Sequence, residues 1–267
     1  MEESKIIENI KINPYIIENI NNPTDEMKLL AVKKNGLLLR SINNPTREME
    51  EIALANNSMA IQYIKNPTED MMIKAIDAGW TNLNYIKNPT DKVIKAAINQ
   101  SGWAIKYIEN PSEEIQLLSV RKNYDSIKYI KNPYESVQNE AVNISYDALI
   151  YINSPCYSAQ LIAIKNNDSA IRFINDLDKN KLLEFLKVNI LVIKHCTVEI
   201  SKDELEEVLK EVISSEDVEE NYIRNFLNCS VIDINSDIIK MDKIKFIYNY
   251  GSKKAKKIAV DEKLKIM

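Results

Sequence analysis

Few residues of this chain combine the types and the spacing that catalysis requires. The sole histidine, His195, stands beside Cys196, but adjacent residues of a helix point in different directions and cannot form a nucleophile and base pair. The other cysteines, Cys156 and Cys229, complete no pattern with the spacing of metal ligands. The sequence also lacks a glycine-rich phosphate loop. We therefore expect no catalytic residue, no metal, no cofactor and no enzymatic activity.

A helical-repeat enzyme such as a base-excision glycosylase is the enzymatic alternative. Such an enzyme needs a buried acid beside an aromatic cradle, and Asp77 near Trp80 is the one weak candidate. Nothing in the sequence identifies Asp77 as buried. Acidic pairs such as Glu69-Asp70 stand at expected helix starts, where acidic side chains are solvated and stabilise the helix.

Another group of residues suits binding rather than catalysis. Large apolar and aromatic side chains recur about once in every 22 residues, at Leu37, Met59, Trp80, Trp103, Tyr124 and Tyr146. Aromatic and methionine side chains aligned on one edge are typical of protein-binding hot spots. The alternative is that they only close over the ends of helices. We take this aromatic edge as the best candidate for a partner-binding surface.

Basic residues suggest a polyanion as a different ligand. The candidates are Arg40, Lys106, Lys128, Arg172, Lys253, Lys254, Lys256 and Lys257. A ladder of rings accompanies them and could stack on bases or only fill space between helices, at Tyr63, Tyr85, Tyr107, Tyr129, Tyr151 and Phe173. Residues 23–176 hold 17 basic and 18 acidic residues, so no strong positive field results. Nucleic acid or nucleotide is therefore the second choice of partner.

A repeat of 22 residues positions all these groups. Prolines recur at that spacing, at Pro23, Pro45, Pro67, Pro89, Pro111, Pro133 and Pro155. Counted from its proline, each repeat has Ala or Ser at position 9, a branched apolar residue at positions 10 and 17, and Ile at position 20. Positions 5 and 9 share one helical face, and positions 17 and 20 share another. Two short helices cannot bury these faces alone, so the repeats must stack.

The start of the first helix in each repeat is marked clearly. In the repeat that begins at Pro67, the sequence predicts Asn66 as the N-cap, Pro67 as the first helical residue and Glu69 as an acid at the third. A helix of about eleven residues follows, then a turn near position 13 that is often Asn or Gly, and then a shorter second helix.

The repeat frame extends beyond the prolines and then ends. We expect an array over residues 1–198, with consensus repeats over 23–176 and degenerate end repeats over 1–22 and 177–198. Residues 199–220 carry ten acids and two lysines, whereas residues 240–267 carry nine lysines and three acids. Ser201 and Glu204 match a capping box. Residues 199–267 are thus either a C-terminal helical cap, with its acidic and basic helices facing each other, or a separate module.

These observations predict an all-α fold: a right-handed-type α-solenoid of about eight to nine two-helix repeats with a C-terminal helical cap. The four glycines of the chain are too few for a fold rich in β-turns. Three unclustered cysteines suit a reducing compartment, so we expect a cytoplasmic protein. We see neither a signal-like start nor a long apolar run, so we expect no membrane insertion and no membrane partner.

The run Asn-Pro-Thr-Glu, the following Ala-Val or Ala-Ile, and the segment Gly102–Ile108 carry a resemblance. They resemble the short two-helix repeats of uncharacterised bacterial and phage proteins and, more distantly, the leucine-rich-repeat variant solenoids. The resemblance covers residues 1–198 and implies a binding scaffold without implying a reaction. The leading hypothesis is a non-enzymatic scaffold that binds a protein partner, as an inhibitor or adaptor in a bacterial or phage setting.

Overall fold

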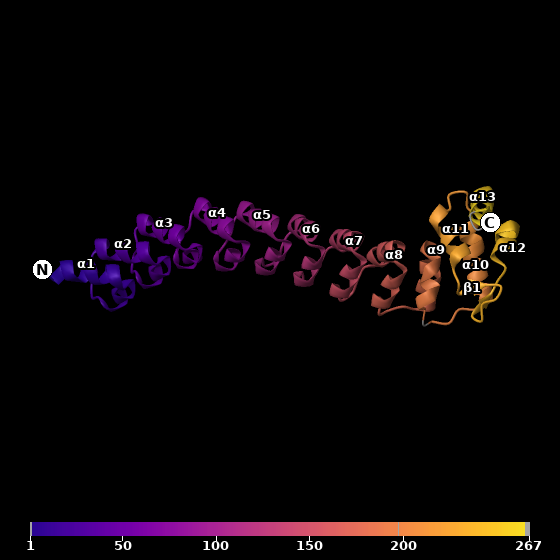
Figure 1. The fold of residues 1–267 in the computed structure, drawn as a ribbon, viewed down its shortest axis with the longest axis horizontal. Coiled ribbons are helices and arrows are strands. Elements are labelled where there is room, and N and C mark those ends of the chain that lie inside the picture. Colours follow the sequence, from indigo (N-terminus) through magenta and orange to yellow (C-terminus); the bar gives the residue numbers. More distant parts are fainter. Residues whose placement is uncertain (1, 197, 265–267) are drawn as a thin grey trace. The chain divides into compact units, whose positions relative to one another are not determined.

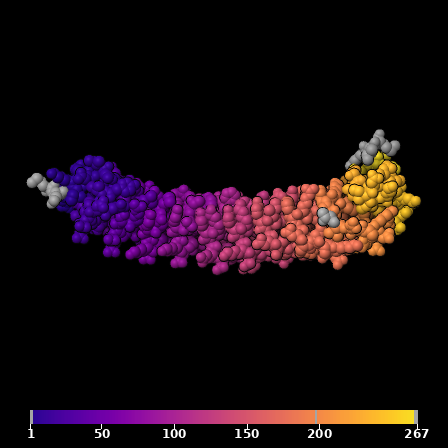
Figure 2. Space-filling model, turned by 90° about the horizontal axis from the view of Figure 1, so that it is seen from below, coloured from indigo at the N-terminus to yellow at the C-terminus, as the bar shows by residue number. Residues whose placement is uncertain are grey.

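The computed structural model describes residues 2–196 and 198–264, and it is the all-α solenoid that the repeat predicts. Helices make up 71% of it and follow one another in pairs of an α-helix and a 3-10 helix, as Figure 1 shows. The chain forms two compact units, residues 1–132 and 133–267. Within each unit the repeats succeed one another in sequence order along the surface (Figure 2). The handedness of the array stays a prediction.

An α-helix forms the first element of each pair. The series starts with α1 (Glu2–Ile12), and the helices that follow have ten residues each, about one fewer than predicted. In the first unit they are α2 (Asp25–Lys34), α3 (Arg47–Asn56), α4 (Glu69–Ala78), α5 (Asp91–Gln100) and α6 (Glu113–Lys122). In the second unit they are α7 (Glu135–Ile144), α8 (Tyr157–Asn166) and α9 (Lys179–Val188).

A six-residue 3-10 helix forms the second element, where the sequence predicted a short second helix. A spacing of three residues fits one turn of a 3-10 helix as well as one face of an α-helix, so the pattern could not separate the two. The 3-10 helices of the first unit are η1 (Pro14–Asn19), η2 (Gly36–Ser41), η3 (Ser58–Tyr63), η4 (Trp80–Tyr85), η5 (Gly102–Tyr107) and η6 (Tyr124–Tyr129). Those of the second unit are η7 (Tyr146–Tyr151), η8 (Asp168–Phe173) and η9 (Ile190–His195).

The α-helices start later than the sequence predicted. Helix α4 begins at Glu69, and its cap is Thr68, whose hydroxyl accepts a hydrogen bond from the Met71 amide at 3.3 Å. The predictions of Asn66 as the cap, Pro67 as the first helical residue and Glu69 as the third were therefore wrong. A threonine at this point already satisfies the amide of the third helical residue, so the proline lies ahead of the cap.

The asparagine before the proline turns the chain in four of the repeats. Asn22, Asn44, Asn88 and Asn110 have φ values between 50° and 55°, which is the left-handed region. Asparagine occupies this region more readily than most residues because its side chain can hydrogen-bond locally. The residue thus redirects the chain from a 3-10 helix into the next α-helix.

Small residues let the helices approach closely. The position 9 residues Ala53 and Ala97 are fully buried, as the sequence predicted for this column. Position 16, which the sequence analysis did not single out, is small in five of the seven consensus repeats and includes the fully buried Ala60, Ala104 and Ala148. Each of the helices α2 to α6 contacts the 3-10 helix of its own repeat and that of the repeat before; α3, for instance, contacts both η2 and η3.

Four α-helices follow the last repeat. They are α10 (Lys202–Ile213), α11 (Glu220–Asn228), α12 (Lys243–Tyr250) and α13 (Lys253–Leu264). Between α11 and α12, two parallel two-residue strands pair, β1 (Ile232–Asp233) and β2 (Ile239–Lys240). The division into an array over 1–198 and a module over 199–267 stays a prediction, and residues 265–267 of that module lie outside the described residues.

Three carboxylates of the acidic segment after the array are paired with lysines of the last repeats. Three ion pairs join α8 and α9 to it: Lys165 to Glu219 at 2.7 Å, Lys179 to Glu204 at 2.7 Å, and Lys187 to Glu211 at 2.8 Å. Beneath them, the buried hydroxyl of Tyr222 donates a hydrogen bond to the Leu186 carbonyl at 2.9 Å. Helices α10 and α11 therefore cover the open end of the last repeat.

Two further contacts fix the helices of this region. The predicted capping box is confirmed, because Ser201 and Glu204 bond each other's backbone amides at the start of α10. The acidic and basic segments meet at Glu216, whose carboxylate accepts hydrogen bonds from the Lys253 and Lys254 amides at 3.0 and 3.2 Å.

No helix of the described residues is long and apolar enough to cross a bilayer.

Candidate functional site

The predicted aromatic edge lies at the start of the 3-10 helices. Trp80, Tyr124 and Tyr146 are the first residues of η4, η6 and η7, whereas Leu37, Met59 and Trp103 are the second residues of η2, η3 and η5. Successive residues of a 3-10 helix are a third of a turn apart, so the six side chains do not project in one direction. Met59 and Trp103 are exposed, with 38% and 39% of their surface accessible, and the other four are half-buried.

At η5, a lysine lies over two aromatic rings. The Lys106 Nζ atom is 4.7 Å from the ring centre of Tyr107 and 5.2 Å from that of Trp80. The two rings are themselves 6.1 Å apart and tilted by 38°. No ion pair involves Lys106 within the described residues, so the ring faces are its main electrostatic partners.

The next repeat has the same arrangement with a carboxylate added. The Lys128 Nζ atom lies 5.0 Å from the ring centre of Trp103 and 5.2 Å from that of Tyr129, and it also bonds Asp125 at 2.8 Å. The Trp103 indole donates a hydrogen bond to the other oxygen of Asp125 at 2.8 Å. Burial raises the pKa of Asp125, but the hydrogen bonds from Lys128 and Trp103 outweigh burial and leave the pKa below its usual value. Asp125 is therefore ionised at neutral pH and holds both neighbours in place.

Three groups that the sequence analysis kept apart thus meet on η4, η5 and η6. We call this set the aromatic–lysine surface, and its residues are Trp80, Trp103, Lys106, Tyr107, Asp125, Lys128 and Tyr129. Trp103 and Tyr129 are 39% and 41% exposed while their polar or charged neighbours hold them. The surface offers aromatic area in a fixed geometry, which suits contact with another macromolecule.

The second unit has a different polar cluster at η8 and η9. His195 Nε2 lies 2.9 Å from Asp168 Oδ2, and Arg172 lies 3.0 Å from His195 Nδ1. A guanidinium can only donate, so Nδ1 accepts and Nε2–H donates to Asp168. Asp168 escaped the sequence analysis because its partner is a repeat away. Burial raises the pKa of the neighbouring Cys196 to about 11, so that thiol is protonated at neutral pH.

Other members of the predicted sites make different contacts. Arg40 on η2 is paired with Glu18 at 3.1 Å, and Tyr146 on η7 stacks on Phe173 with the ring centres 6.2 Å apart. The predicted C-terminal polyanion residues are exposed on α13, at Lys253, Lys254, Lys256 and Lys257. The carboxylate of Glu216 occupies the amides at the start of that helix, where a phosphate would otherwise bind.

The structure offers no support for the glycosylase alternative. Asp77 is exposed on α4 and is not enclosed beside Trp80. A catalytic carboxyl of the kind required is buried and has a perturbed pKa. Within residues 2–196 and 198–264, no three His, Cys, Asp or Glu side chains gather in a way that could hold a metal ion.

Buried glutamines are a polar feature that the sequence analysis missed. Gln116, Gln138 and Gln160 stand five residues after a proline and donate to that proline's carbonyl at 2.9–3.1 Å. The Gln138 carbonyl oxygen also accepts a hydrogen bond from the Cys156 amide of the next repeat at 2.8 Å. Gln recurs at position 6 of three successive repeats, and this recurrence in the sequence could have identified the buried glutamines. All three side chains are buried, and Gln138 thus joins two successive repeats.

The described fold and surface define a class of protein, an α-solenoid built from 22-residue repeats. No protein-family model, no curated protein and no solved structure matches this chain. Its function must therefore be argued from its own side chains.

Proposed function

We propose that this chain is a non-enzymatic scaffold of the cytoplasm that binds a protein partner, as an inhibitor or adaptor, through the aromatic–lysine surface. The observation that carries this proposal is the fixed, partly exposed position of Trp103 and Tyr129. Asp125 and Lys128 hold both rings before any partner arrives. A pre-ordered aromatic side chain loses little entropy on binding, which is why such residues dominate protein interfaces.

The same contacts favour a protein over a nucleic acid as the partner. Binding to a phosphate backbone depends on free cations, but Lys128 is paired with Asp125 and Arg40 with Glu18. Lys106 alone among the three carries no carboxylate within the described residues. A surface on which rings outnumber available cations suits a partner with apolar side chains and an occasional acid.

The proposal is tested by capture from a lysate of the natural host with the double variant Trp80→Ala/Trp103→Ala. Truncating a hot-spot residue costs on the order of 2 kcal/mol or more, so a specific partner should be lost from the variant. The matched control is Tyr15→Ala/Tyr134→Ala, which removes two rings that are each 50% exposed and lie outside this surface. Far-ultraviolet dichroism of all three proteins establishes that the fold is intact.

Each sample is divided and one half is treated with nuclease before mass spectrometry. A stoichiometric protein that survives nuclease, binds the control and is lost from the Trp80→Ala/Trp103→Ala variant supports the proposal. Capture that disappears with nuclease and falls steeply with salt would replace it with nucleic-acid binding. Equal capture by the variant and the control would exclude the aromatic–lysine surface.

A further inference from the structure

The last helix exposes apolar side chains that the fold does not use. Helix α13 buries Ala255, Ile258 and Ala259 against its neighbours. Its opposite side carries lysines together with Val260 and Leu264, which are 58% and 64% exposed. The outer side of a helix that only caps a solenoid needs no apolar residue. Val260 and Leu264 therefore add apolar area to the side of α13 that carries its lysines.

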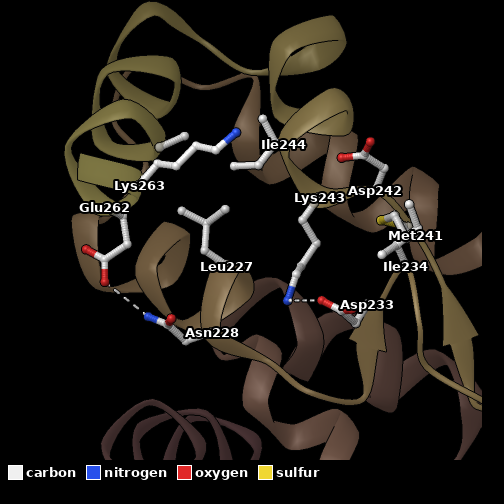
Figure 3. A pocket seen from close by; sticks show the side chains of 11 residues that line it. Leu227, Asn228, Asp233, Ile234, Met241, Asp242, Lys243, Ile244, Glu262 and Lys263 are labelled. Atoms are coloured by element: carbon white, nitrogen blue, oxygen red, sulfur yellow. Dashed lines mark hydrogen bonds and ion pairs between the residues drawn. The ribbon is translucent and has the colours of Figure 1, made fainter. Parts of the chain in front are cut away.

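Helix α12 continues this exposed side. Ile244 and Tyr248 stand four residues apart on one side of α12 and are 39% and 75% exposed. Lys256 of α13 lies over the Tyr248 ring with its Nζ atom 5.8 Å from the ring centre. Ile244 lies one turn before Tyr248 on α12, and Lys263 lies two turns after Lys256 on α13. Ile244 and Lys263 line the same hollow, as Figure 3 shows. The exposed sides of the two helices thus run next to each other.

We call this region the α12–α13 face, and its residues are Ile244, Tyr248, Lys256, Lys257, Val260, Lys263 and Leu264. Val260 lies one helical turn from both Lys256 and Lys263, so it belongs to the same side of α13. The hollow beside Ile244 and Lys263 has a volume of about 380 Å³ and separates the face from Leu227 and Ile234. Ile234 itself is 61% exposed, which extends the apolar area.

The charge of the α12–α13 face is positive and is not neutralised by the protein. None of Lys256, Lys257 and Lys263 takes part in an ion pair of the described residues. Of the nearby acids, Glu262 bonds Arg224 and Asn228, and Asp242 caps the start of α12. Asp261 is exposed on α13 four residues after Lys257, and the three lysines outnumber it. Lysine side chains left free among exposed apolar residues form a surface that attracts anions and apolar groups at once.

We propose that the α12–α13 face adsorbs to an anionic lipid surface. Exposed Tyr248 would lie at the level of the headgroups, where an aromatic ring with a polar tip is stable. Lys256, Lys257 and Lys263 would reach lipid phosphates while their methylene chains stay in apolar surroundings. Val260, Ile244 and Leu264 would enter the boundary of the acyl chains. The inference concerns a separate surface and does not depend on the proposed protein partner.

The sequence pattern does not indicate this contact because its apolar residues are dispersed. Adsorption needs one exposed side of short helices, whereas insertion needs a long apolar run, and this chain has no membrane-spanning helix in the described residues. The proposal therefore goes beyond the expectation of no membrane partner. A lipid surface is favoured over an acidic protein because Tyr248, Val260 and Leu264 are exposed among lysines on short helices, which is the pattern of helices that lie in a membrane interface.

The test is co-sedimentation of the full chain with two kinds of vesicle. One kind contains phosphatidylcholine and phosphatidylglycerol in equal amounts, and the other contains phosphatidylcholine alone. We expect binding to the anionic vesicles only, and weaker binding at high salt. Lys256→Gln and Lys257→Gln should each lower the partition coefficient about fivefold. Tyr248→Ser/Val260→Ser should lower it on the order of tenfold or more.

Matched variants in the repeats distinguish binding by the α12–α13 face from nonspecific effects of charge and exposed apolar surface. Lys87→Gln/Lys131→Gln removes two exposed lysines, and Ile150→Ser removes an apolar residue that is 55% exposed. Both should bind vesicles as the wild type does. Absence of sedimentation with anionic vesicles overturns the proposal, as does equal loss in the control variants. Binding of poly-glutamate with the same dependence on Tyr248, without vesicle binding, would show an interface for acidic proteins instead.

Discussion

At the scale of single residues, one repeat replaces two buried alanines by serines whose polar atoms are hydrogen-bonded. Ser119 takes the place of alanine at position 9, and Ser126 takes its place at position 16 of the same repeat. The two buried hydroxyls lie 2.7 Å apart, and Ser119 also donates to the Gly102 carbonyl at 2.9 Å. Neighbouring repeats have alanine at both positions, so the pair is a polar variant of the same core.

A double-mutant cycle should expose the dependence of each serine on the other. Ser119→Ala leaves the buried Ser126 hydroxyl without this partner and should lower the free energy of unfolding by about 1–3 kcal/mol. Ser119→Ala/Ser126→Ala recreates the alanine pair of neighbouring repeats and should recover part of that loss. Urea unfolding followed by circular dichroism measures both. A double variant whose loss equals the sum of the losses in Ser119→Ala and Ser126→Ala would show that the hydroxyls do not interact.

The residue scale also shows why part of the candidate site could not be predicted. The aromatic residues and lysines of the aromatic–lysine surface were all picked out from the sequence. Their grouping was not, because the contact of Trp80 with Tyr107 joins position 14 of one repeat to position 19 of the next. Such a contact depends on how far one stacked repeat is displaced from the next. The pattern of residues within a repeat does not specify that displacement. Asp125 and Asp168 were missed for the same reason.

At the scale of elements, the pairing of helices was predictable and their type was not. Periodic apolar residues and the proline series specify two helices per repeat and their buried sides. Where a glycine begins η2 or η5, the 3-10 helix packs closely against the next α-helix. At Gly102 an added Cβ would overlap the Ser119 backbone oxygen of that helix. Where Ser58 holds the same position, a hollow of about 550 Å³ lies between α3 and α4.

Two glycine substitutions should therefore differ in outcome. Gly102→Ala places a methyl group against the backbone of α6 and should destabilise the protein by about 1–3 kcal/mol. Gly79→Ala meets no atom closer than 3.9 Å and keeps an extended backbone, so it should be neutral or stabilising by up to about 1 kcal/mol. Thermal and urea unfolding of the two variants give the comparison. Equal destabilisation would contradict the role of close approach at η5.

The capping box of α10 provides a pH-dependent element. The hydrogen bond from Lys179, followed by that from the Ser201 amide, lowers the pKa of Glu204 from 4.5 to about 2. A carboxyl whose folded pKa is depressed contributes stability above its unfolded pKa and loses it as the pH falls through the folded pKa. The contribution of Glu204 should therefore be complete above about pH 4.5 and disappear toward pH 2.

Glu204→Gln tests this assignment because it keeps the acceptor oxygen and removes the charge. The variant should be less stable than the wild type near pH 6, and the difference should shrink as the pH falls below 4.5. Urea unfolding at a series of pH values measures the difference. A gap that stays constant down to pH 2 would mean that Glu204 does not titrate in this window.

At the scale of the whole molecule, stability in a solenoid is the sum of repeats and of contacts between neighbours. The last repeat packs against the helices C-terminal to it. Phe185 and Leu186 of α9 are fully buried, α10 and α11 contact this repeat, and Tyr222 bonds the Leu186 carbonyl at 2.9 Å. Removing residues 199–267 would expose this apolar area and break the ion pairs of Lys179 and Lys187.

Truncation after residue 198 should therefore lower amide protection in α9 and η9 and leave α2 to α5 unchanged, because coupling in a solenoid passes mainly between neighbours. Hydrogen exchange read by mass spectrometry resolves the two regions. Leu205→Ala/Leu209→Ala loosens the same contact in the full chain and covers the case of an aggregating truncation, since both leucines are fully buried. Protection of α9 that survives both changes would make residues 199–267 an independent module, whereas loss in α9 alone would make them the cap on which the last repeat depends.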